Sequence, residues 1–493
     1  MEAYQIGSIE GRWANFVPPI QGGKFRSRMA LDTLEQDFAA QHIEHDTSSS
    51  QSAPESSSTF GLTNHRLSHL RRRKTGGPCS SRASSTSSMS SVELDDARSK
   101  QKLSFMDART QEEIDLDMSK YPALNPTIQD SIVRKYRLLN DRIRAEGLYN
   151  CRFSSYMIES CRYALIFAFF LFFLGRGWYA TSGFFLGMFW HQLVFTAHDA
   201  GHMGITHDFT IDTVIGIIIA DFLGGLSLGW WKRNHNVHHI VTNSPEHDPD
   251  IEHMPFFAIS HRFFESLRST YYDRVMSYDA FAEFMIKYQS YLYYVVLTFG
   301  RFNLYRLSWE YLLLGRGPRK GPAWWHRWFE IAGQFFFWAW FGYGVLYKGV
   351  PTAWARFTFI VVSHMVTMPL HVQITLSHFA MSTADLGTNE SFPQKMLRTT
   401  MDVDCPQWLD FFHGGLQFQA IHHLYPRIPR HNLRRTQKLV QEFCNDVNIP
   451  YALYGFVDGN KQVIGRLGDI GRQAAILAEC QKSIVRSEDY GMH

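Results

Sequence analysis

Histidines gather at three places in this sequence where their spacing could build a metal site. Seven of the 23 histidines stand in these three groups: His198 and His202; His235, His238 and His239; His422 and His423. Residues three or four positions apart on an α-helix share one face, so the side chains of a group can approach a common point. Neutral imidazole is a ligand for Zn, Cu, Fe and Ni.

Taken together, the three groups predict metal binding. A lone histidine on an apolar face is usually a satisfied core residue, and one HxxxH pair is weak evidence for a ligand. Seven clustered imidazoles exceed the roughly three protein ligands of a catalytic zinc, so they could hold two metals. No HExxH occurs, which disfavours a zinc metalloprotease. Two irons held mostly by imidazole could activate dioxygen beside an apolar slot for an acyl chain.

The histidine groups must be positioned by the apolar segments of the chain. Four segments lack Lys, Arg, Asp and Glu: residues 163–175, 178–197, 331–347 and 357–377. With flanking residues each is close to the roughly 20 residues that a bilayer span needs. Breaks at Arg176-Gly177 and 348–351 would be turns. We therefore expect an all-α integral membrane protein with four transmembrane helices in two hairpins. The apolar stretch 211–229 carries Asp212 and Asp221 and is interpreted as in-plane or buried.

An even number of spans places both termini and all three histidine groups on one side of the membrane. Basic residues flank the third predicted span on that side: Arg316, Arg319, Lys320 and Arg327. Cytosolic segments next to spans carry an excess of Lys and Arg. We expect a cytosolic helical cap that holds the histidine site.

Composition narrows the class further. Of the 493 residues, 45% are hydrophobic, 19% are charged and the net charge is +3, which gives no strong case for a nucleic-acid partner. The mean hydropathy of −0.21 indicates large polar parts beside the apolar helices. Six scattered cysteines without a CxxC pair fit a reducing compartment. The N-terminus lacks the apolar run of a signal peptide, and the serine-rich stretch 48–91 predicts a disordered linker.

The wider sequence resembles a known family. HDAGH at 198–202, HNVHH at 235–239 and QAIHH at 419–423 resemble, in this order, the three histidine boxes of membrane fatty-acyl desaturases. Gln419, in place of a first His in the third box, is similar to the front-end subgroup. Three further phrases add to the resemblance: Trp230-Trp231-Lys232, Asp248-Pro249-Asp250 and His422-His423-Leu424-Tyr425-Pro426-Arg427-Ile428-Pro429-Arg430. It covers roughly residues 122–449.

The resemblance implies two Fe ions, O2 as co-substrate, and electrons from cytochrome b5 and its reductase in the endoplasmic reticulum membrane. The ligands that it implies are His198, His202, His235, His238, His239, His422 and His423. Gln419 would be a weak or outer ligand. Ser377-His378-Phe379 resembles an Asn-His-Phe phrase of related desaturases, which makes His378 the eighth candidate ligand. His364 and His371 share its stripe and are interpreted as buried polar residues.

The N-terminal part departs from the family. Front-end desaturases of this kind carry a cytochrome b5 domain with a His-Pro-Gly-Gly haem site, and no HPGG occurs here. Residues 4–13 and 15–23 nevertheless resemble the end of such a domain. We interpret residues 1–28 as a remnant without haem, served by a separate cytochrome b5; the alternative is that the recorded sequence starts late. Residues 29–121 would be a mostly disordered linker, 122–449 the membrane desaturase domain and 450–493 a C-terminal cytosolic tail.

The expected substrate is a sphingolipid. Residues 426–430 resemble the Δ8-sphingolipid branch, and residues 15–23 with the serine-rich insertion resemble its fungal members. We predict desaturation at the 8-position of the sphingoid long-chain base of ceramide. Arg427, Arg430 and Asn432 could meet the polar head, and an ordinary role at a helix start or in a loop is an equal alternative.

Three other functions stay open at this stage. A front-end fatty-acid desaturase of the Δ5 or Δ6 type and a related lipid hydroxylase would use the same boxes. A metal-handling transporter would instead place its polar ligands near the bilayer midplane. The lipid chain length, the cis or trans product and the oligomeric state do not follow from the sequence.

Overall fold

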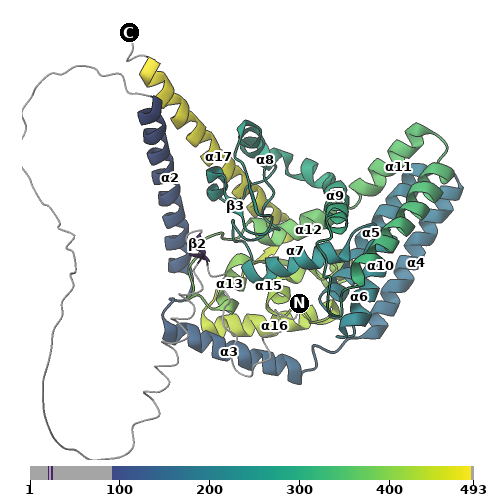
Figure 1. The fold of residues 1–493 in the computed structure, drawn as a ribbon. Helices are drawn as coiled ribbons and strands as arrows, with labels where there is room; N and C mark the ends of the chain where they lie inside the picture. The colour runs from purple at the N-terminus through teal and green to yellow at the C-terminus, as the bar shows by residue number, and fades with distance from the viewer. Residues whose placement is uncertain (1–19, 22–23, 26–90, 490–493) are drawn as a thin grey trace, which may run out of the picture.

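The first predicted hairpin is present. In the computed structural model, which describes residues 20–21, 24–25 and 91–489, the apolar residues after Arg152 form α4 (Phe153–Gly175). The chain turns at Arg176-Gly177 and returns as α5 (Tyr179–Gly201). The two helices pack against each other along their length (Figure 1).

The second predicted hairpin follows the same plan. Helix α10 (His326–Phe337) continues as the π-helical η5 (Trp338–Gly349), and the chain returns as α11 (Ala353–Met365) and α12 (Met368–Phe379). Small residues let α5 approach α11 closely: a Cβ at Gly187 would lie 2.5 Å from the carbonyl oxygen of Ser363. Gly183 lies one turn earlier on the same face, in a GxxxG spacing typical of packed membrane helices.

Length and hydropathy identify fewer spans than the sequence pattern predicts. Within the described residues, Phe153–Gly175 and Ala353–Phe379 are long and apolar enough to cross a membrane. Helices α6 (Phe209–Ile217), η3 (Ile218–Leu223) and α7 (Leu228–Val241) pass the test only as a pair bent by 118°. The structure therefore supports two spans, or three if the bent pair is one. Helices α5 and α10–η5 occupy the positions of the other two predicted spans.

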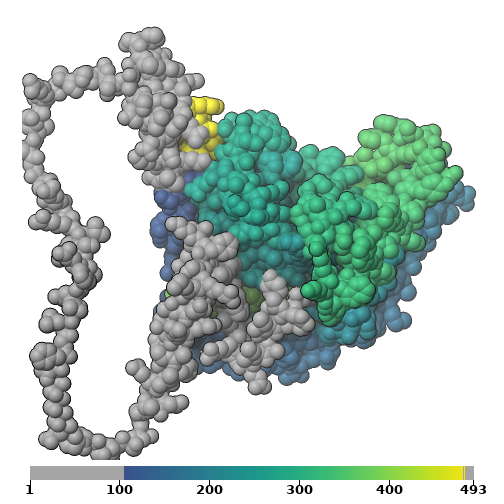
Figure 2. Space-filling view, in the orientation of Figure 1, coloured from purple at the N-terminus to yellow at the C-terminus, as the bar shows by residue number. Residues whose placement is uncertain are grey.

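The hairpin ends carry exposed apolar side chains. Trp178, Trp354 and Phe357 are each more than half exposed near the two turns. Figure 2 shows the α10–α11 end as a lobe that projects from the rest of the surface. Exposed apolar surface of this kind fits contact with lipid.

Four helices outside the two hairpins share one buried core. The predicted amphipathic helix is α3 (Pro126–Ala145), whose N-terminus is capped by the Asn125 side chain. It shares a buried core with α13 (Phe392–Thr399), α15 (Gln419–Leu424) and α16 (Arg430–Val447). Ile143, Leu433 and Val440 are each at most 3% exposed in this core.

A second core includes residues from both sides of the predicted membrane desaturase domain. Helices α8 (Ala280–Thr298), α12 and α17 (Phe456–Asp489) pack together, and Met106 of α2 (Ser91–Lys120) is buried with them. Met106 lies before residue 122, the predicted start of the membrane desaturase domain, and finds an apolar partner surface in this core. Helix α17, in the predicted C-terminal tail, packs on the same core. Apart from residues 20–21 and 24–25, the predicted haem-free remnant lies outside the described residues, as does most of the serine-rich linker.

Short elements complete the described part. The remaining helical elements are η4 (His261–Glu265), α9 (Gly300–Leu313), η6 (Gln407–Leu409), α14 (Asp410–His413) and η7 (Leu416–Phe418). The strands are β1 (Ile20–Gln21), β2 (Lys24–Phe25), β3 (Arg268–Ser269), β4 (Arg274–Val275), β5 (Asp402–Asp404) and β6 (Leu453–Gly455). β5 and β6 are parallel, with Asp402 opposite Leu453, whereas β1–β2 and β3–β4 are antiparallel. The β5–β6 pair joins α17 to the segment before α15.

Candidate metal centre

Four helices bring the predicted ligands together. His198 and His202 lie at the end of α5, and His378 lies in the last turn of α12. The second box lies on α7, whose first turn is capped by the Ser227 side chain, and the third box lies on α15. Figure 1 shows α7, α12 and α15 near one another in the middle of the fold.

The ring nitrogens form two groups. In the first histidine group the possible ligand atoms lie within 4.8 Å of one another, and its members are His198, His202, His235 and His422. The second histidine group meets the same limit and consists of His238, His378 and His423. Seven of the eight candidate ligands therefore fall into two clusters, and His378 is one of the seven.

His239 lies between the two groups. Its Nε2 is 3.1 Å from the Nε2 of His235, a member of the first group. Its ring centroid is 4.2 Å from that of His423, a member of the second. All eight predicted histidines thus share one buried region.

Acidic and hydroxyl groups hold several of the rings from behind. His238 Nδ1 lies 2.8 Å from Asp248 Oδ2, and His235 Nδ1 lies 3.4 Å from Asp250 Oδ2. His423 Nδ1 is 3.2 Å from the hydroxyl of Thr242. A hydrogen bond at one ring nitrogen fixes the ring and leaves the other nitrogen for a metal. Asp248 and Asp250 belong to the sequence phrase Asp-Pro-Asp that resembles the family, but the sequence did not predict a role for either of them.

Unpartnered nitrogens mark where a ligand fits. Among the eight candidate ligands, six buried ring nitrogens have no hydrogen-bond partner within the described residues: His198 Nε2, His202 Nε2, His239 Nδ1, His378 Nδ1, His422 Nε2 and His423 Nε2. Buried polar atoms without partners are rare and costly in proteins. Burial, followed by repulsion from neighbouring imidazoles, holds the pKa of His422 and His423 well below the usual value. Neutral imidazole is the form that binds metal, so these two rings suit a transition-metal ion. Against the effect of burial, the neighbouring carboxylate of Asp248 raises the pKa of His238 to about 9.

Asp402 supports the third box, and no motif in the sequence points to it. Its Oδ1 accepts a hydrogen bond of 2.8 Å from the backbone N–H of Ala420, in the first turn of α15. Gln437 and Tyr451 donate to its other oxygen. Burial raises the pKa of Asp402 to about 6. Gln419, the neighbouring residue, is buried, and its side-chain oxygen has no partner among the described residues.

Two of the residues considered for the lipid head are used within the protein. Arg430 is ion-paired with Asp199 and Glu159. Asn432 donates to the carbonyl oxygens of Leu148, at 2.8 Å, and Asn150. Their structural role is therefore favoured, while Arg427 remains exposed.

The deeper histidines lie outside both groups. His364 bonds through Nδ1 to the carbonyl oxygen of Ile360 at 2.8 Å and stacks on Phe302. His371 lies one heptad before His378 and is not among the grouped residues. These contacts agree with the interpretation of His364 as a buried polar residue.

Helical hairpins with paired groups of buried histidines define a class, the helical membrane proteins with a histidine-rich metal site. The model of the fatty acid desaturase family matches residues 176–455, and the chain belongs to this family.

Three relatives give the comparison more detail. A Delta 8-(E)-sphingolipid desaturase of Emericella nidulans is 66% identical over 493 residues, covering 100% of this chain and 87% of that protein. One of the same name from Kluyveromyces lactis is 48% identical, covering 98% of this chain and 83% of its own length. A Delta(8)-fatty-acid desaturase of Helianthus annuus is 34% identical over 73% of this chain and 78% of its own.

Proposed function

We propose that this chain is an O2-dependent front-end desaturase that introduces an (E) double bond at the 8-position of the sphingoid long-chain base of ceramide. The observation that carries the proposal is the pair of buried histidine groups. The chain that carries these groups is 66% identical to one protein named Delta 8-(E)-sphingolipid desaturase and 48% identical to another, in both cases over nearly its whole length. The predicted sphingolipid branch agrees with these relatives.

Two iron ions are the proposed metals. The first histidine group would hold one iron and the second histidine group the other, with His239 between them and Gln419 as an outer contact. With O2 and two electrons from cytochrome b5 and its reductase, the iron centre would supply the oxidant that removes two hydrogens from adjacent carbons. Asp248 and Asp250 would hold His238 and His235 with the metal-binding nitrogens turned inward.

The protein's part in the reaction is to place the chain and its head. The histidines lie at the inner ends of α5 and α12 rather than midway along them. If the head of a ceramide stays at the membrane surface, the carbon atom that reaches the histidines is set by the distance between the head and the histidine groups. Exposed Arg427, four residues after His423, could contact the head. The distance from head to metal would then select the 8-position, as a front-end mode requires.

The membrane arrangement is part of the proposal. We place four spans, at α4, α5, α10–η5 and α11–α12, in the endoplasmic reticulum membrane, with both termini and the cap in the cytosol. Arg319 and Arg327 beside α10 support this orientation. Tags at Glu2, His493 and Arg319 should all be reached by antibody after selective opening of the plasma membrane. A protected tag at any of the three would contradict the orientation.

The test of the reaction is expression in a yeast that lacks Δ8-sphingolipid desaturation, supplied with sphingoid base. We expect 8-(E)-unsaturated base in ceramide, iron in the purified protein, and no product from His235→Ala at equal expression. New polyunsaturated acyl chains with an unchanged long-chain base would move the protein to the fatty-acid branch.

The same experiment separates the alternatives. A hydroxylated base would indicate a hydroxylase, and metal uptake without O2 consumption would indicate a transporter. Turnover of the purified chain should require added cytochrome b5, and a stoichiometric haem absorption band in the purified chain would contradict a separate donor.

A further inference from the structure

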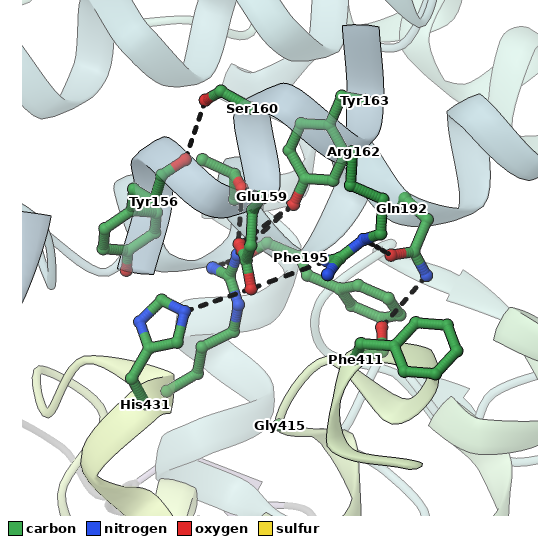
Figure 3. Close-up of polar contacts among 12 residues, drawn as sticks. Tyr156, Glu159, Ser160, Arg162, Tyr163, Gln192, Phe195, Phe411, Gly415 and His431 are labelled. Atoms are coloured by element: carbon green, nitrogen blue, oxygen red, sulfur yellow. Dashed lines mark hydrogen bonds and ion pairs between the residues drawn. The ribbon is translucent and has the colours of Figure 1, made fainter. Parts of the chain in front are cut away.

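Arg430 lies at the centre of a buried charge network. It is the first residue of α16 and is 7% exposed. Its guanidinium pairs with Asp199 of α5 and Glu159 of α4, and it donates to the carbonyl oxygen of Phe195 at 3.0 Å. Figure 3 shows Glu159 between Tyr163 and His431, each joined to it by a hydrogen bond. Two carboxylates therefore converge on one guanidinium in the interior.

The two carboxylates differ in what stands next to them. Asp199 lies within the first histidine box, and its Oδ1 is 3.9 Å from the Nδ1 of the adjacent His198. Its other side-chain oxygen also accepts a hydrogen bond from Tyr156. Glu159 lies on α4, which contributes no histidine to either group. Of the two ion pairs of Arg430, the one with Asp199 thus leads to the first histidine box, and the one with Glu159 leads to α4.

Arg430 is also tied to the third box. It follows His423 by seven residues, and the intervening segment is held in a turn by the Ile428 N–H, which donates to the Tyr425 carbonyl at 3.1 Å. The turn that leads into this box contains Gly415, with a φ of +96°. A Cβ there would lie 2.9 Å from the Cβ of Arg430. Arg430 is therefore seated against the turn into the box and bonded to the helix of another box.

We propose that Arg430 is a positioning residue of the metal centre, which fixes the first histidine box against the third through Asp199. The planar guanidinium can hold Asp199 and the Phe195 carbonyl together, so it sets both the place and the rotation of the last turn of α5. The Glu159 bond anchors α16 to the membrane helix and has no direct effect on the histidines. This inference rests on the proposed iron centre.

Two matched substitutions separate the roles. Asp199→Asn and Glu159→Gln each remove one carboxylate charge from Arg430 without changing side-chain size. We expect Asp199→Asn to lower iron occupancy and Co²⁺ affinity by about tenfold or more, because groups that orient metal ligands have effects of this size. Glu159→Gln should keep both within about twofold while lowering the temperature of unfolding. Arg430→Lys keeps the charge but loses the planar fork, so its metal binding should fall with that of Asp199→Asn.

The measurements are iron content of the purified full chain, Co²⁺ titration followed by its visible absorption, and thermal unfolding. Equal loss of metal affinity in Asp199→Asn and Glu159→Gln would overturn the inference, because Arg430 would then act through stability alone. Unchanged affinity in both Asp199→Asn and Arg430→Lys would overturn it as well. An unaltered chain that binds no iron would overturn the proposed metal centre itself, and this inference with it.

Discussion

Helix α5 contributes adjacent residues to two buried polar clusters, which differ in whether their polar atoms have hydrogen-bond partners. His198 belongs to the first histidine group, in which ring nitrogens are buried without partners. Asp199 belongs to the Arg430 network, in which the guanidinium and both carboxylates are bonded. Because folding disfavours unpaired buried polar atoms, the first cluster is arranged for something that the chain does not supply. In the second cluster the three charged groups neutralise one another within the protein.

The difference separates binding from support. A metal site needs donors aimed at one point and held there before the metal arrives. In this chain the histidine side chains are held by hydrogen bonds and ion pairs formed around them. These come from Asp248 to His238, from Asp402 to the start of α15, and from Arg430 to Asp199. Changes in the incomplete cluster should therefore abolish chemistry, whereas changes in the supporting bonds should weaken it or lower stability.

The largest effect is expected from loss of a ligand. Alanine at any one of five positions should reduce product to below about 1% with membrane insertion intact, because the ligands act as a unit. These positions are His198, His235, His239, His422 and His423. Quantifying 8-unsaturated base at equal expression checks this. Alanine at His45 or His65, which lie outside the described residues, should change nothing, and a ligand variant with near-normal turnover would not be a ligand.

Loss of a supporting carboxylate should be milder. Asp248→Asn keeps the shape but weakens the hold on His238 Nδ1. Metal affinity or turnover should fall about tenfold to a hundredfold, the range for partners of metal-bound histidines. Co²⁺ titration and product yield measure this. Asp446→Asn is the matched control, since its carboxylate is 61% exposed and pairs with Lys135 at the surface. Equal effects of the two changes would contradict a role for Asp248 at the metal site.

The turn that seats Arg430 should respond through stability. Gly415→Ala would place a Cβ 2.9 Å from that of Arg430 at a φ of +96°. This strain should cost about 1–3 kcal/mol, seen as a lower unfolding temperature. Gly465→Ala in α17 is the opposite case, since its Cβ would meet no atom within 4 Å. Alanine should stabilise that helix by roughly 0.5–1 kcal/mol. If both changes destabilised the protein, the effect at Gly415 could not be attributed to its contact with Arg430.

The last effect is confined to a pH window and concerns the pH dependence of stability contributed by Asp402. Burial raises its pKa from 3.8 to about 6 in the folded chain, so the folded state binds the proton more tightly than the unfolded state. Its contribution to stability is fully present below pH 3.8 and is lost as the pH rises through about 6. The difference in unfolding temperature between the unaltered chain and Asp402→Asn should therefore change across this window by the equivalent of about 3 kcal/mol. A constant difference would show that Asp402 does not titrate there.

The sequence alone predicted the candidate ligands and the helices that carry them. Histidines three and four residues apart must share a helix face, and uncharged stretches separated by Arg176-Gly177 must turn there, so both conclusions depend only on local geometry. The resemblance of residues 426–430 to a sphingolipid branch was likewise readable from the chain. His378 could be included because its three-residue phrase matched the family.

Tertiary packing decided how these pieces are used. His235 and His238 are three residues apart, yet they join different groups. His235 lies with the two histidines at the end of α5, whereas His238 lies with His378 of α12, and α15 contributes one histidine to each group. The burial of Arg430 between α4 and α5, and the ordering of α2 through Met106, likewise depend on partners far away in the sequence. Spacing along a helix fixes which side chains can meet. Which of them do meet, and which charges are neutralised on the way, depends on long-range contacts that no local pattern contains.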